Sequence, residues 1–216
     1  MRFSLPTTVS LALLLGALSS AASAASSLNV VSATTPANPT TVSFSNGMSG
    51  FAPNYTFSYG ALAATGPGSV TYTYLGSEAG YNNSFVASGN AIFFNHAFDN
   101  HGATVVGSSF TQNVASGLLS FGFSTKSPVY SVNNGVSGTY GADQGVFGIV
   151  SGASVANKSY QYVLIYNDPV YGGDHDYNDM AIGINFTAAV PEPESYAMLM
   201  AGLGLLGCIA RRRRKA

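Results

Sequence analysis

An acidic segment between two apolar segments is the part of this sequence best suited to chemistry. Residues 167–179 read NDPVYGGDHDYND and contain four of the seven acids found between Ala25 and Ala189. Crowded carboxylates repel one another unless a cation neutralises them, and Ca²⁺ takes roughly six to eight oxygen ligands. The segment therefore predicts a calcium site, whose candidate ligands here are Asp168, Asp174, Asp176, Asn178 and Asp179.

The sequence leaves two explanations of this acidic segment open. Asp174, Asp176 and Asn178 follow the D-x-D-x-N pattern that opens an EF-hand loop. Asp179 then stands where an EF-hand needs glycine, which leaves a different oxygen-rich calcium loop as the first explanation. The second is turn chemistry, because Asp and Asn side chains commonly bond nearby backbone amides in loops.

No set of residues predicts catalysis. The chain has no G-x-S-x-G, no P-loop and no H-E-x-x-H motif. His96 and His101 could present two imidazoles to zinc, but no cysteine lies near them, and a polar surface loop is the better interpretation. Glycosidases use two separated carboxyl groups on different elements, whereas these aspartates share one loop. We therefore expect no enzymatic activity.

Several segments of the chain alternate apolar and polar residues, as half-buried strands do. The clearest are 70–74, 119–123 and 180–186, and shorter candidates are 91–94, 145–150 and 160–166. Asn-Gly and Pro-Gly pairs separate these segments, as turns would. The pattern predicts an all-β fold, with one antiparallel β-sandwich or jelly-roll-like domain over residues 41–189. Residues 25–40, rich in Ser, Thr and Ala, are expected to form a flexible lead-in.

The composition excludes several classes of partner and chemistry. Only 8% of residues are charged, against about 25% in typical soluble domains. The region between Ala25 and Ala189 contains two lysines and seven acids, which gives it a net charge of −5. Nucleic acid is therefore not an expected partner. The single cysteine, Cys208, lies outside this region, so no disulfide is expected.

Residues 1–24 have the three parts of a secretory signal peptide. Arg2 supplies the positive charge, residues 9–18 are apolar, and Ala22 and Ala24 form a small-x-small cleavage site before Ala25. We therefore expect export through the Sec translocon and removal of this segment.

The segment 190–216 has three parts in order. Residues 190–194 contain Pro191-Glu192-Pro193, and the two prolines prevent a helix there. Residues 195–210 are small and apolar, and we expect them to form a single transmembrane helix. The basic residues Arg211, Arg212, Arg213, Arg214 and Lys215 then act as a membrane stop on the cytoplasmic side.

This order of Pro-Glu-Pro, short apolar helix and basic cluster resembles the PEP-CTERM sorting signal. The resemblance implies recognition of Pro191, Glu192 and Pro193 by exosortase, a membrane-embedded enzyme of Gram-negative bacteria that make exopolysaccharide. It also implies that the tail is removed after a transient stay in the inner membrane. The physical pattern alone is equally compatible with a plain tail anchor that is not processed.

The acidic segment also resembles part of a module of unknown function found in exported bacterial proteins. The resemblance rests on residues 174–179, DHDYND, and on residues 75–83, LGSEAGYNN. It implies that Glu78 is a remote sixth ligand of the predicted calcium site.

Taken together, these features predict a secreted structural or adhesive protein of the cell surface or extracellular matrix, associated with exopolysaccharide. Two rival functions remain: a calcium-dependent carbohydrate-binding module and a secreted hydrolase. Sugar-binding surfaces use aromatic faces, for which the candidates are Tyr55, Tyr59, Tyr72, Tyr74, Tyr166 and Tyr171.

Overall fold

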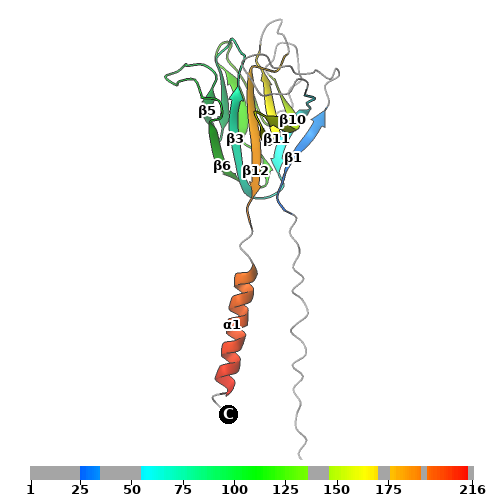
Figure 1. Ribbon diagram of the computed structural model, residues 1–216, viewed down its shortest axis with the longest axis vertical. Helices are drawn as coiled ribbons and strands as arrows, with labels where there is room; N and C mark the ends of the chain where they lie inside the picture. Colours follow the sequence, from blue (N-terminus) through cyan, green and yellow to red (C-terminus); the bar gives the residue numbers. More distant parts are fainter. Residues whose placement is uncertain (1–24, 35–54, 136–145, 170–175, 191–193, 214–216) are drawn as a thin grey trace, which may run out of the picture.

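A computed structural model of the chain describes residues 25–34, 55–135, 146–169, 176–190 and 194–213. Over these residues the chain forms twelve strands and one helix, which confirms the predicted all-β class. The strands form three antiparallel sheets of five, four and three strands (Figure 1).

The five-stranded sheet carries the acidic segment and has the order β10-β11-β12-β3-β6. Its strands are Val146–Val155, Lys158–Asn167, Met180–Ala188, Gly68–Gly76 and Ser109–Val114, in that order. Consecutive side chains of a strand point to opposite faces, yet Val163, Leu164 and Ile165 of β11 are all fully buried. This sheet is therefore covered on both faces at its centre.

The four-stranded sheet covers one of these faces and has the order β5-β4-β8-β9. Its strands are Asn90–Phe94, Asn83–Ala87, Phe121–Thr125 and Tyr130–Asn133. Aromatic rings join the two sheets: Tyr72 lies 5.0 Å from Phe85, and Phe123 stacks on Tyr166 at 4.6 Å between centroids. The two sheets thus form the predicted β-sandwich around one aromatic core.

The third sheet contains a strand that the sequence analysis did not predict. It consists of β1 (Leu28–Thr34), β2 (Tyr59–Ala64) and β7 (Gly117–Leu118). Leu28 and Leu62 are buried in the sandwich core, and the Tyr162 hydroxyl donates to the Leu28 carbonyl at 3.1 Å. The prediction of a flexible lead-in over 25–40 is therefore wrong for residues 28–34, because β1 buries Leu28 and pairs with β2.

The outer face of the five-stranded sheet has its own apolar cluster. Val146, Val150, Val163 and Ile165 are buried there beneath the ring of Phe57. A Cβ on Gly148 would come within 2.4 Å of that ring, so glycine lets Phe57 lie directly against β10.

One predicted strand is divided between two sheets. The alternating segment 119–123 predicts a single strand, but β7 ends at Leu118 and β8 begins at Phe121. Between them the Leu119 amide donates to the Leu62 carbonyl at 3.0 Å. The chain therefore passes from the three-stranded to the four-stranded sheet at these residues.

Residues 194–213 form the helix α1 (Glu194–Arg213), which lies apart from the sheets in Figure 1. Among the described residues, no helix has both the length and the apolar character needed to cross a membrane. The predicted helix is thus present, and its role as a transmembrane span stays a prediction. The apolar run between Glu194 and Arg211 would be about 24 Å long, shorter than a bilayer core of about 30 Å.

The buried tyrosines of the sandwich predict a loss of stability at alkaline pH. Burial raises the pKa of Tyr74 to about 12 and raises the pKa values of Tyr72 and Tyr166 still further. Above pH 10 the unfolded chain loses these protons while the folded chain keeps them, so the free energy of unfolding falls as pH rises. We expect a slope on the order of 1 kcal/mol per pH unit for each tyrosine.

Urea unfolding between pH 8 and pH 11 measures this slope. Tyr74→Phe should reduce the slope, because it removes a hydroxyl whose pKa is raised by burial in the folded chain. An identical slope in the variant and the parent would contradict the assignment.

Candidate functional site

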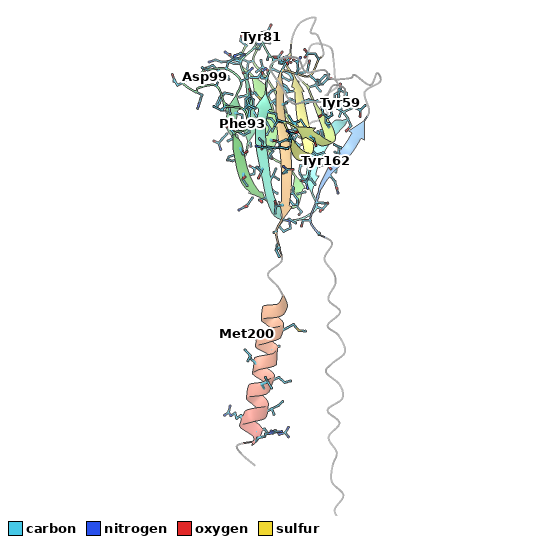
Figure 2. All side chains as sticks on the ribbon, in the orientation of Figure 1. Tyr59, Tyr81, Phe93, Asp99, Tyr162 and Met200 are labelled. Carbon is cyan, nitrogen blue, oxygen red and sulfur yellow. The ribbon has the colours of Figure 1, made fainter. Side chains whose placement is uncertain are left out.

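The predicted ligands come from two loops that leave the same end of the sandwich. Glu78 follows β3, and residues 168–179 connect β11 to β12, which lies beside β3. The Glu78 amide donates to the Asn178 carbonyl at 3.0 Å, so the two loops are in contact. Figure 2 places Tyr81, from the loop that contains Glu78, at the end of the sandwich away from α1.

The outer part of this site brings two carboxylates to one amide. Asn178 Nδ2 donates to Glu78 Oε2 at 3.1 Å and also to Asp176 Oδ2. The Asn178 backbone amide donates to Asp176 Oδ1 at 3.3 Å. All three residues are half-buried. Residues that are 100 positions apart in sequence thus converge on one point at the surface.

The inner part of the site contains two buried carboxylates. Asp168 is 1% exposed and Asp179 is 8% exposed. The Asp168 amide donates to Asp179 Oδ2 at 2.6 Å, and the Asp179 amide donates to the Tyr166 carbonyl at 3.1 Å. These contacts close the base of the loop, as expected of Asp side chains that bond nearby backbone amides.

A chain of side-chain hydrogen bonds connects Asp168 to the opposite sheet. Thr125 Oγ1 donates to Asn83 Oδ1 at 2.7 Å, and Asn83 Nδ2 donates to Asp168 Oδ2 at 2.9 Å. Thr125 has a single hydroxyl proton, so the Tyr166 hydroxyl, 2.9 Å away, must donate to Thr125 Oγ1. All the donors therefore point toward the carboxylate, which stabilises its charge.

The protonation state of Tyr166 agrees with its role as the donor to Thr125. Burial, above all, raises the pKa of its hydroxyl, and the nearby Asp168 and Asp179 raise it further, against the hydrogen bond with Thr125. Tyr166 is therefore neutral at physiological pH and remains a donor.

Neither lysine of the described sandwich lies at these carboxylates. Lys126 Nζ pairs with Asp99. Lys158 begins β11 at its far end and pairs with Val155 at the hairpin turn, nine residues before Asn167. The carboxylates of Asp168 and Glu78 instead accept hydrogen bonds from neutral amides, those of Asn83 and Asn178.

The structure places the predicted ligands in two groups. Glu78, Asp176 and Asn178 form the outer group, and Asp168 and Asp179 form the inner group. Asp174 lies outside the described residues, as does His175. Within the described residues no group of three or more His, Cys, Asp or Glu side chains could hold a metal ion. The calcium site stays a prediction, and turn chemistry explains the contacts of the inner group.

Other candidate residues have separate environments. His96 Nε2 contacts the Ala79 carbonyl at 2.8 Å, whereas the His101 ring stacks on Phe94 at 4.3 Å. Both histidines are exposed, as expected of a polar surface loop. Three of the tyrosines considered for sugar binding, Tyr72, Tyr74 and Tyr166, are buried in the core, so they are not available at the surface. Tyr171 lies outside the described residues.

The sequence analysis missed the residues that hold the inner group. Asn83 begins β4 and Thr125 ends β8, and both are fully buried. Asn83 lies in the LGSEAGYNN segment, but no spacing in the sequence indicates that its amide meets Asp168.

Removing the Asn83 amide should destabilise the sandwich. Asn83→Ala takes away the donor to Asp168 and the acceptor of Thr125, both of which are buried. We expect a loss of about 2–4 kcal/mol in the free energy of unfolding, measured in urea, because a buried charged group loses a partner. Asn113→Ala, on an exposed part of β6, is the matched control and should change stability by less than about 0.5 kcal/mol. Equal losses in the two variants would show that the hydrogen bonds of Asn83 between the sheets do not contribute measurably to the free energy of unfolding.

Comparison with known proteins bears on the segment that follows the sandwich. A family model described as the PEP-CTERM protein-sorting motif matches residues 189–215. No curated protein and no solved structure matches the chain. The matched residues begin directly after β12 and include α1, so the match confirms the predicted sorting tail and does not reach the sandwich. The chain thus carries a PEP-CTERM sorting motif at residues 189–215, which marks it as an exported protein targeted to exosortase.

Proposed function

We propose that the β-sandwich is a non-enzymatic structural or adhesive module, which acts in association with exopolysaccharide at the cell surface or in the extracellular matrix. The observation that carries this proposal is the sorting motif, which begins at the residue after the last strand. That motif implies export, transient membrane anchoring and surface localisation. A chain with 8% charged residues and many uncharged polar ones suits contact with neutral glycan chains.

Calcium is proposed as the ion that rigidifies the acidic loop. Glu78 Oε2 and Asp176 Oδ2 both accept from Asn178 Nδ2. A rotation of the Asn178 amide by half a turn would aim its oxygen at the same carboxylates. Three such oxygens repel one another without a cation and form part of a calcium shell with one. Asp174 and backbone or water oxygens would complete the shell.

This proposal predicts that calcium raises the melting temperature of the purified chain. A ligand that binds only the folded state stabilises it by about 2.7 kcal/mol at a hundredfold excess over its Kd. The melting temperature should rise in millimolar Ca²⁺, fall back in EGTA, and respond less to Mg²⁺, which demands a smaller and more regular shell.

Variants locate the ion. Glu78→Gln combined with Asp176→Asn should abolish the calcium-dependent rise. Asp99→Asn, which removes a carboxylate paired with Lys126 in another loop, should preserve it. A melting temperature that calcium and chelator leave unmoved would reject the calcium proposal and leave the sorted structural module intact.

Processing at both ends is the test of the delivery step. Intact mass should show loss of residues 1–24 and a second cut near Pro191 to Pro193 in protein recovered from the cell surface or the medium of its host. Replacing Pro191 and Pro193 by alanine should retain the tail and keep the chain in the membrane fraction. Glu194→Gln, the matched control beside the motif, should be processed normally. An intact tail on the surface protein would mean simple anchoring without exosortase.

A further inference from the structure

A single asparagine side chain joins the three-stranded sheet to the sandwich. Asn134 follows β9, and its backbone amide donates to the Phe121 carbonyl at the start of β8, at 2.9 Å. Its side chain pairs with the backbone of β2: Oδ1 accepts from the Leu62 amide at 2.9 Å, and Nδ2 donates to the Leu62 carbonyl at 2.8 Å. Nδ2 also donates to the Leu119 carbonyl at 2.8 Å. The oxygen and both hydrogens of this amide are therefore engaged.

The position after Asn134 favours glycine for two reasons. Gly135 has a φ of +86°, in the left-handed region that residues with a side chain rarely adopt. A Cβ at this position would also come within 2.7 Å of Leu118 Cδ1. The contacts of the side chain at 134 and the backbone at 135 together place an Asn-Gly pair at this junction.

Asn-Gly is the pair in which asparagine loses its amide most readily, because glycine has no side chain to hinder attack by its backbone nitrogen. The Gly135 nitrogen attacks Asn134 Cγ and gives up its proton, ammonia leaves, and a five-membered succinimide ring forms. Water then opens the ring at either carbonyl, which gives aspartate or an isoaspartyl linkage. The attack makes Cγ tetrahedral and turns the amide away from Leu62 and Leu119. Deamidation thus requires the hydrogen bonds to the three-stranded sheet to break.

We propose that Asn134 is a deamidation site whose reaction the three-stranded sheet suppresses. This sheet is suited to local opening, because β7 pairs with β2 at only two positions and irregular pairing interrupts β1. When the sheet separates from the sandwich, the amide is released and reacts. The product, aspartate, has no amide hydrogens and would place a carboxylate against the Leu62 and Leu119 carbonyls. Deamidation therefore makes a temporary opening permanent.

The inference goes beyond the proposed function, because the reaction needs neither calcium nor glycan. It concerns how long an exported chain keeps its fold. Each copy that opens at this sheet is converted to a form that cannot restore the original contacts, whereas a copy that stays closed keeps its most reactive amide.

Peptide mass spectrometry of the purified full chain measures the reaction. During incubation at mildly alkaline pH, Asn134 should deamidate at least about tenfold more slowly in buffer than in urea, because the reaction in buffer waits for local opening. The chain has a second Asn-Gly pair, Asn46-Gly47, which serves as the control in urea, where the two asparagines should react at similar rates. Equal rates for Asn134 in buffer and in urea would overturn the proposal, as would a rate in urea far below that of Asn46.

A pair of core variants tests whether this particular sheet controls the reaction. Leu28→Ala removes a buried side chain from β1, whereas Val150→Ala removes one of similar burial from β10, beneath Phe57. In buffer Leu28→Ala should accelerate deamidation of Asn134 at least about threefold more than Val150→Ala does, because it loosens the three-stranded sheet directly. Circular dichroism checks that both variants are folded. Equal acceleration by the two variants would reject control by this sheet.

Asn134→Asp reproduces one product of the reaction. Hydrogen exchange should show the amides of β2 exchanging at least about tenfold faster in this variant than in Asn133→Asp. Asn133→Asp is the matched control, because it introduces the same charge at the neighbouring exposed position of β9. Equal exchange in the two variants would show that the amide of Asn134 does not hold the sheet in place, which would also overturn the proposal.

Discussion

The hydrogen bond from the Asn83 amide to the Asp168 carboxylate connects the two sheets of the sandwich at the point where the acidic loop begins. A buried carboxylate is stable only when hydrogen bonds replace its lost hydration, and Asp168 is 1% exposed. Its donor Asn83 begins β4 of the opposite sheet, and Asn83 in turn accepts from Thr125 at the end of β8. The base of the loop is therefore connected to the opposite sheet through Asn83, in addition to the contacts among Asp168, Asp179 and Tyr166 that close it.

The packing of the five-stranded sheet accounts for much of the unusual composition. Its central strands β11 and β12 are covered on one side by the aromatic core and on the other by the cluster around Phe57. Strands buried on both faces have no solvent-facing side on which to place charges. The acids are consequently concentrated in the loops that leave the sheet. The crowding of carboxylates at residues 167–179 follows in part from the fold, quite apart from any ion that binds there.

Alternation in the sequence predicted the strands in which it is strong, such as β3 and β12, and failed where tertiary pairing decides. In β1, Leu28 and Val30 are too few to stand out among Ser, Thr and Ala, yet Leu28 fills a place in the core. The passage from β7 to β8 preserves the alternation while the chain changes sheets, so the pattern cannot mark it. In the site, clustered acids identified Asp168 and Asp179, but Asn83 on β4 and Thr125 on β8, which connect Asp168 to the opposite sheet, are distant in sequence and give no local signal.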